Sequence, residues 1–198
     1  STTIGILFSL INKSGGAVEI FGIDIDEDFP AAKKHIGIVP QEFNFNLFEK
    51  VEHIVTTQGG YYGLPPDLAR QRAEKYLRKL GLWEKRNVSA RELSGGMKQR
   101  VGLARAFSVS PRILLLDEPF AQIDALTRGV IQNELVRMWQ ETGITVFMVT
   151  HDVDEAILLA DRILLMTNGP FARIAESVKV DLARPRLRSE IIHDPGYY

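Results

Sequence analysis

Apolar strand-like segments alternate with helical segments from Ser94 onward in this 198-residue sequence. Three such pairs follow one another, and they comprise a helix from Ser94 with a strand at 113–116, a helix at 125–141 with a strand at 145–150, and a helix at 153–160 with a strand at 162–166. Strands that are apolar on both faces need helices on both sides, as in the parallel sheets of α/β proteins. The sequence therefore predicts an α/β fold with a largely parallel sheet.

The pattern before Ser94 is less regular. Apolar residues recur at helical spacing over Ile4–Ile11, which predicts a first helix closed by Gly15-Gly16. Alternating or continuous apolar residues predict strands at 17–21 and 35–39, and an amphipathic helix begins at Asp67 and stops before Gly81.

A hairpin-type turn follows the last apolar strand of the alternation. Asn168-Gly169 matches the two-residue turns that join antiparallel strands, and it leads into a predicted strand at 172–178. The tail from Asp181 is rich in arginine and proline and is predicted to be irregular.

Composition excludes several kinds of function. The formal net charge of −1 and a pI of about 6.4 give no electrostatic case for a nucleic-acid partner. The absence of cysteine excludes disulfides, thiolate metal sites and cysteine catalysis, and suits a reducing cytosol. The length is that of one domain with a substantial core. No apolar run reaches the roughly 18 residues that a membrane-spanning helix needs.

Two acidic residues stand at the end of an apolar strand. Asp117 and Glu118 follow Ile113–Leu116 and precede Pro119. In open α/β sheets, ligands bind at the carboxyl edge of the strands, which is where this pair is predicted to lie. The alternative is that the two acids cap the next helix, but their place between the strand and the proline favours ligand binding.

A serine and two glycines are predicted to open a helix at Ser94-Gly95-Gly96. A hydroxyl and bare backbone N–H groups at a helix N-terminus form a place where an anion can bind. A plain N-cap is the simpler interpretation, since Ser-Gly-Gly alone is common. The longer run Leu93–Arg100 is far rarer.

Three runs, Leu93–Arg100, Ile113–Pro119 and Val149–Asp152, form an ordered set that resembles the ATP-binding-cassette (ABC) family, the ATPases of membrane transporters. The resemblance implies a P-loop NTPase (RecA-like) core with a mostly parallel sheet, an inserted helical subdomain and a small antiparallel β portion. It further implies a single ABC ATPase domain over 1–198, with the helical subdomain at 42–92.

The resemblance implies ATP and Mg²⁺ as ligands and assigns roles at the predicted sheet edge. Asp117 would serve Mg²⁺, usually through water, and Glu118 would polarise the attacking water. Gln41, after a strand closed by Pro40, would reach both Mg²⁺ and that water, and His151 would contact the γ-phosphate. Without this context, Gln41 would be an exposed loop residue, His151 would be structural, and the neighbouring Asp152 is expected to cap a helix.

The run Leu93–Arg100 corresponds to the family's signature. In the family, the signature binds the ATP held by a second subunit, which implies a head-to-tail dimer. The further residues that the resemblance assigns to nucleotide binding are Ser94, Gly95, Gly96, Gln99 and Asp124. Met97 stands where the family more often has glutamine, and Ala121 stands where it usually has serine.

The family's phosphate loop, G-x-x-x-x-G-K-[ST], is represented only by its last position, as Ser1 followed by Thr2. The resemblance implies that Ser1 binds Mg²⁺, that both residues bind nucleotide, and that the chain starts inside this loop, so that it should bind ATP poorly. An ordinary helix N-cap is the alternative for Ser1.

The two parts of the chain resemble different subfamilies of ABC ATPases. The part after the signature is similar to ATPases of nitrate, sulfonate and taurine importers, in the runs 116–120, 124–128, 149–156, 167–170 and 195–198. Val51–Gly63, before the signature, is similar to exporter-type (multidrug) ATPases. A hybrid chain joined at the signature is the hypothesis that follows, and it leaves import against export undecided.

The function implied is an ATPase subunit on the cytoplasmic face of a membrane, partnered with transmembrane permease subunits. The aromatic residues of 43–62 are expected to form the packing and contact surface toward that membrane partner. ABC proteins that act on DNA or the ribosome are the alternative within the family. A cassette fragment that folds but has little or no ATPase activity is the non-enzyme alternative.

Overall fold

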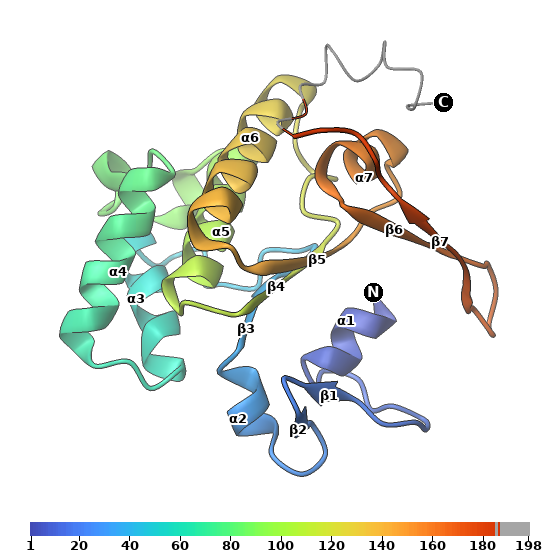
Figure 1. Cartoon of the computed structure of the whole chain (residues 1–198). Coiled ribbons are helices and arrows are strands. Elements are labelled where there is room, and N and C mark those ends of the chain that lie inside the picture. Colours follow the sequence, from blue (N-terminus) through green and yellow to red (C-terminus); the bar gives the residue numbers. More distant parts are fainter. Residues whose placement is uncertain (185, 187–198) are drawn as a thin grey trace. The chain divides into compact units, whose positions relative to one another are not determined.

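The computed structural model describes residues 1–184 and 186, and it contains two compact units. The first spans Ser1–Val149 and the second begins at Thr150. Figure 1 shows the first unit as a short central sheet with helices and a small N-terminal lobe, and the second as a helix with a hairpin.

A parallel sheet forms the centre of the first unit. Its strands are β3 (Ile36–Val39), β4 (Ile113–Asp117) and β5 (Thr145–Val149), in the order β3-β4-β5. Both pairings are parallel, with Val39 opposite Leu116 and Asp117 opposite Val149. Strand β4 is almost entirely buried, as its continuous apolar sequence predicts. The predicted parallel sheet is therefore confirmed for these strands.

Two long helices pack beside this sheet and against each other (Figure 1). Helix α5 (Gly95–Ser108) precedes β4, and α6 (Ala125–Thr142) precedes β5. Helix α6 ends at Gly143, whose φ of 63° is the left-handed C-cap conformation that glycine adopts without strain. The predicted start of α5 at Ser94 and the predicted bounds of α6, 125–141, agree with the structure to within one residue.

Helices α3 (Val51–Tyr61) and α4 (Pro66–Lys79) pack on each other and on α5. Both lie inside the range 42–92, and two short 3₁₀ helices, Trp83–Lys85 and Ala90–Glu92, follow them. The face of α4 that carries Ala73 and Leu77 is fully buried, which agrees with its predicted amphipathic pattern.

The first helix is shorter than predicted. Helix α1 covers Thr2–Leu7, and the prediction that it continues to Gly15-Gly16 is wrong. The N–H groups of Leu10 and Ile11 donate to the Gly5 carbonyl at 2.7 and 3.1 Å, which turns the chain back on the helix. A Cβ at Gly5 would lie 2.6 Å from Ile11 Cδ1, so Ile11 occupies the space that the missing side chain leaves.

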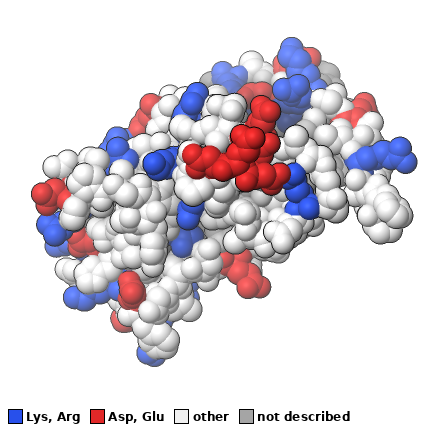
Figure 2. All heavy atoms as spheres, turned by 90° about the horizontal axis from the view of Figure 1, so that it is seen from below, with Lys and Arg blue, Asp and Glu red and all other residues white. Residues whose placement is uncertain are grey.

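The rest of the N-terminal lobe is small. Strands β1 (Glu19–Ile20) and β2 (Ile23–Asp24) form an antiparallel pair, so the strand predicted at 17–21 is only partly formed. Helix α2 (Phe29–Lys33) leads into β3. Figure 2 looks at this end of the molecule and shows acidic side chains gathered near the middle of that face, with basic ones scattered around them.

The second unit contains α7 (Val153–Leu159) and an antiparallel pair of strands, β6 (Arg162–Met166) and β7 (Ile174–Lys179). The predicted hairpin is confirmed, but its connection spans residues 167–173 and is not a two-residue turn at Asn168-Gly169. Gly169, within this connection, has a φ of 99°. The expectation that the strand at 162–166 extends the parallel sheet is wrong. Among the described residues, β6 pairs with β7 in a separate two-stranded antiparallel sheet.

Two arginines hold the chain after β7 against the end of α7. Arg186 donates hydrogen bonds to the carbonyls of Ile157 and Val180, at 3.0 and 3.2 Å, and to two further carbonyls, and its side chain is 2% exposed. Arg184 donates to the Leu159 carbonyl at 2.6 Å. Residues 181–184 form no helix or strand, as predicted, and Pro195–Tyr198 lie outside the described residues.

Within the described part of the chain, no helix combines the length and the apolar character needed to cross a lipid bilayer.

Candidate nucleotide site

The carboxyl edge of β4 brings two predicted metal ligands together. Asp117 is the last residue of β4 and is 8% exposed. Its carboxylate Oδ2 pairs with the α-amino group of Ser1, although the two residues are 116 positions apart. The Ser1 hydroxyl also accepts the Ile4 N–H at 3.4 Å, so Ser1 is the N-cap of α1 as well as a neighbour of Asp117. Thr2 is the first residue of the same helix and is exposed.

Glu118 leaves the strand in a strained turn. Its φ is 47°, in the left-handed region that a non-glycine residue rarely adopts. Such a conformation costs on the order of 1–3 kcal/mol and is found preferentially at functional sites. The Glu118 N–H donates to the Val149 carbonyl at 2.9 Å, and the Glu118 carbonyl accepts the Ala121 N–H at 3.2 Å. Phe120, two residues later in the same turn, is fully buried.

Gln41 lies at the same edge of the sheet as Glu118. Parallel pairing sets Val39 opposite Leu116, and each of the two predicted site residues lies two positions beyond this pair. Parallel strands end at a common edge, so the chain leaves β3 and β4 side by side. Gln41 is exposed there, in the bend that follows Pro40.

The alternative that Asp117 and Glu118 cap the next helix is wrong, because Asp124 is the N-cap of α6. The Asp124 carboxylate accepts the Thr127 N–H at 3.0 Å. Hydrogen bonds from the backbone and side chain of Thr127 hold the pKa of Asp124 below its usual range. The carboxylate therefore stays ionised and complements the positive end of the α6 dipole.

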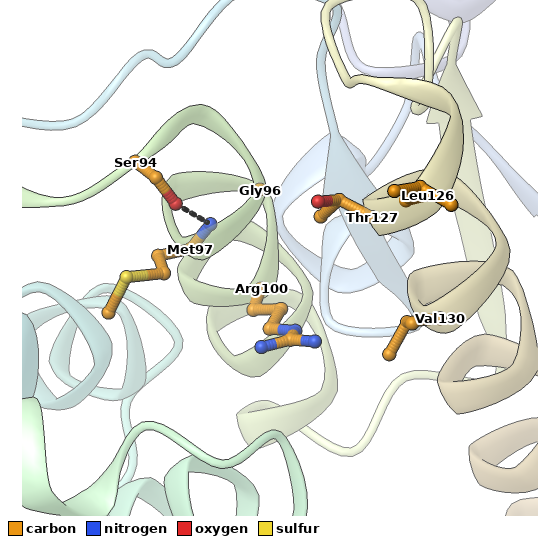
Figure 3. Close-up of a pocket in the computed structure, with 7 residues that line it drawn as sticks. All are labelled: Ser94, Gly96, Met97, Arg100, Leu126, Thr127 and Val130. Carbon is orange, nitrogen blue, oxygen red and sulfur yellow. Dashed lines mark hydrogen bonds between the residues drawn. The ribbon is translucent and has the colours of Figure 1, made fainter.

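Ser94 caps α5, as predicted, because its hydroxyl accepts the Met97 N–H at 3.3 Å (Figure 3). The N-termini of α5 and α6 enclose a hollow of about 300 Å³, the α5–α6 hollow. It is lined by Ser94, Gly96, Met97, Arg100, Leu126, Thr127 and Val130.

The two predicted glycines differ in how closely they are packed. A Cβ at Gly96 would lie 2.4 Å from Thr127 Cγ2, so α5 and α6 approach each other over a bare backbone at this point. A Cβ at Gly95 would meet only the Gln122 carbonyl oxygen, at 3.5 Å, which is an ordinary contact.

The α5–α6 hollow combines one cation with an apolar rim. Arg100 projects into it (Figure 3), and its Nε donates to Glu134 Oε2 at 3.0 Å. Burial raises the pKa of Glu134, and the Arg100 charge opposes that rise. Leu126 is 88% exposed on the α6 side. The Ser94 hydroxyl, the backbone N–H groups at the α5 N-terminus and the Arg100 guanidinium can together bind an anion at this surface.

Gln99 lies away from the α5–α6 hollow. It is 4% exposed, and its Nε2 has no hydrogen-bond partner among the described residues. The structure therefore places Gln99 in the interior of the unit, and its predicted nucleotide contact stays a prediction.

His151 belongs to the second unit and follows the last residue of β5 by two positions. It is exposed, and it directly precedes Asp152, the N-cap of α7. The Asp152 carboxylate accepts the Glu155 N–H at 3.1 Å, which confirms the capping role predicted for it. Thr150 supports the same turn, because its hydroxyl accepts the Asp152 N–H and donates to Glu155.

Sequence reasoning missed Arg100 and Thr127 as residues of this surface. Both could have been found from helical spacing. Arg100 lies three residues after Met97 on the same face of α5, and Thr127 lies three residues after the N-cap Asp124.

Comparison with known proteins supports the resemblance stated above. The family model described as ABC transporter matches residues 1–121. The bicarbonate transport ATP-binding protein CmpD of Synechococcus elongatus is 47% identical over the whole chain, which spans 70% of that protein. The related CmpC is also 47% identical, but the chain spans only 30% of its length.

A nitrate import ATP-binding protein, NrtC of the same organism, is 57% identical over 107 residues, which are 54% of this chain and 16% of that protein. The likeness to nitrate-type importers is thus confirmed. CmpD matches both sides of the signature. The exporter-like character of Val51–Gly63 and the hybrid hypothesis stay predictions.

Solved structures give the same result for the fold. CbiO1 of Clostridium perfringens, part of an ABC transporter complex, superposes with a TM-score of 0.72 at 30% identity, covering 82% of this chain and 66% of that one. The ATP-binding cassette MJ0796, a dimer bound to ADP and Pi, gives 0.77 at 29% identity, covering 90% and 79%. The predicted P-loop NTPase fold class is confirmed.

Proposed function

Because the chain belongs to the ABC transporter family, we propose that it forms the ATPase domain of an importer that couples ATP hydrolysis to solute uptake. Residues 1–198 act as one ABC ATPase domain, in which 42–92 form the helical subdomain. The observation that carries the proposal is the sheet edge where Ser1 and Asp117 meet and where Glu118 and Gln41 leave adjacent strands.

The donor set at this edge fits Mg²⁺. A hydroxyl, a carboxylate and an amide, from Ser1, Asp117 and Gln41, supply the oxygen atoms that Mg²⁺ prefers, and Mg²⁺ usually takes few protein ligands beside substrate phosphates. When bound, the ion neutralises charge on the transferred phosphoryl group. The Glu118 carboxylate orients the attacking water and accepts a proton from it.

The signature side serves a second nucleotide. Ser94, Gly95 and Gly96, at the N-terminus of α5, bind the γ-phosphate of ATP held by another subunit in a head-to-tail dimer, and Asp124 and Gln99 support that contact. The exposed hollow beside Ser94 supports this proposal, as does the dimeric, ADP-bound state of MJ0796. At the first nucleotide, His151 and Gln41 complete the γ-phosphate site beside Glu118.

Transmembrane permease subunits are the proposed partners, with the ATPase on the cytoplasmic face of the membrane. Exposed aromatic side chains in the helical region support a contact there, because Phe48 and Tyr61 are 75% and 76% exposed. The likeness to bicarbonate and nitrate ATP-binding proteins supports a small inorganic anion as the solute.

The test is Mg-ATP hydrolysis by residues 1–198 beside a version that carries the sequence G-x-x-x-x-G-K immediately before Ser1. We expect turnover in the longer version, and a loss of roughly 10²–10⁴-fold in kcat for Glu118→Gln, since the general base is removed. Glu84→Gln, an exposed residue of the helical region, is the matched control and should retain full activity.

Hydrolysis that survives Glu118→Gln would show that Glu118 is not the general base. No hydrolysis by either version would overturn the proposed ATPase activity.

A further inference from the structure

A nearly buried cation, Arg105, lies in α5 and takes no part in the roles proposed above. It is 7% exposed, and burial lowers its pKa. A cation in such a place needs hydrogen-bond partners to offset the loss of hydration. Its Nη2 donates to Asn44 Oδ1, and its guanidinium lies 5.6 Å from the ring centre of Phe45. Both partners belong to the segment that follows Gln41.

A second contact joins the same region to β3. The Tyr62 hydroxyl, at the end of α3, donates to the Ile36 carbonyl at 2.8 Å. Burial raises the pKa of Tyr62 to about 12, although the charge of Arg105 opposes that rise. Arg105 is therefore close to the point where α3, β3, α5 and the segment after Gln41 meet.

Strand β3 and helix α5 are themselves tightly packed. A Cβ at Gly37 would lie 2.7 Å from the Ala106 carbonyl oxygen, closer than real Cβ contacts, whereas one at Gly102 would make an ordinary contact with Val39 Cγ1 at 3.5 Å. Such close contacts leave little room for β3 to slide on α5. The chain after Val39 leaves this packed region as a loop, and Arg105 is the α5 residue that binds it.

We propose that Arg105 is a positioning residue whose hydrogen bond to Asn44 fixes the loop of Gln41 on the helix that begins at Ser94. The inference rests on the proposed function, in which Gln41 serves one nucleotide and Ser94 serves the other. Through Arg105, a displacement of the Gln41 loop is passed to α5, and both nucleotide contacts move as one body.

Because the sequence contains no cysteine, a single introduced cysteine can be labelled at one chosen position. Glu42→Cys, on an exposed position beside Gln41, carries a single nitroxide label whose spectrum reports the mobility of the loop. Asn44→Ala should increase that mobility, because loss of a charge-assisted hydrogen bond raises the population of the detached loop about tenfold. Asn44→Asp keeps an acceptor for Arg105 and should keep the loop fixed.

Asn46→Ala is the matched control. It removes the same side chain two positions away, where Asn46 Oδ1 accepts only the Phe48 N–H within the loop, at 3.0 Å. The control should leave the label's mobility unchanged. Equal mobility in Asn44→Ala and the parent, or an equal rise in Asn46→Ala or Asn44→Asp, would overturn the proposal.

Kinetics give a second measurement in the version that carries the phosphate-loop sequence. Asn44→Ala, without the label, should lower kcat severalfold and leave KM for ATP unchanged, because positioning rather than nucleotide binding is impaired. An unchanged kcat beside an increased mobility would also overturn the proposal. If no version hydrolyses ATP, the proposed function fails, while the mobility measurement still decides whether Arg105 fixes the loop.

Discussion

At the scale of single residues, helix packing as well as ligand binding constrains the glycines of the signature. At Gly96, α5 and α6 approach each other closely, because a Cβ there would lie 2.4 Å from Thr127 Cγ2. Gly95 has no such neighbour. The motif Ser94-Gly95-Gly96 therefore contains one glycine that the fold requires and one that it tolerates losing.

Gly96→Ala should destabilise the protein by about 1–3 kcal/mol, the usual cost of overpacking a close contact. Gly95→Ala should be neutral or slightly stabilising, because alanine favours helix more than glycine does. Urea unfolding of both variants measures the difference. In the background of Thr127→Ser, which removes Cγ2, most of the cost of Gly96→Ala should disappear. A cost that persists there would mean that Thr127 is not its cause.

At the scale of helices and strands, the sequence predicted best where apolar pattern and chain length agreed. The bounds of β4, β5 and α6 were close because continuous apolar strands and long helices leave few alternatives. Helix α1 was overestimated, because the apolar residues at helical spacing in Ile4–Ile11 do not reveal that the chain turns back over Gly5. The strand at 162–166 was placed in the wrong sheet, since periodicity does not tell a parallel from an antiparallel neighbour.

The cap of α6 gives a prediction about pH. The folded-state pKa of Asp124 is lowered by its hydrogen bonds to Thr127, so its stabilisation is complete above the ordinary value of 3.8 and is lost as pH falls through the lower folded pKa. Asn also caps helices but does not titrate. The difference in unfolding free energy between the parent and Asp124→Asn should be constant above about pH 5 and should shift against the parent below pH 4. A difference independent of pH would contradict this.

At the scale of the whole molecule, the sequence predicted the fold class and which residues stand at the sheet edge. Glu118 and Gln41 could be predicted because each follows an apolar strand, and strands of a parallel sheet end at one edge. The contact between Arg105 and Asn44 could not, since 61 positions separate the two residues and neither stands out in the local pattern. The α5–α6 hollow depends on how two helices pack, which the sequence alone does not specify.

The proposed dimer can be tested at the same scale. In the version with the phosphate-loop sequence, Glu118→Gln should trap Mg-ATP unhydrolysed and shift the protein from monomer to dimer in sedimentation velocity. Adding Ser94→Glu should abolish the shift, because a carboxylate at the α5 N-terminus repels the phosphate of the second nucleotide. A dimer that forms equally well with Ser94→Glu would place the contact elsewhere on the surface.

The arginines that follow β7 tie the end of the second unit's described chain back to its helix. Arg186 joins the Ile157 carbonyl, 29 positions earlier, to the Val180 carbonyl, so that the end of α7 and the hairpin lie inside one loop whose ends are tied. Such a tie lowers the entropy gained when any single part opens. Amide exchange in α7 and in the β6–β7 ladder should therefore report the same opening free energy, with the two melting as one cooperative unit.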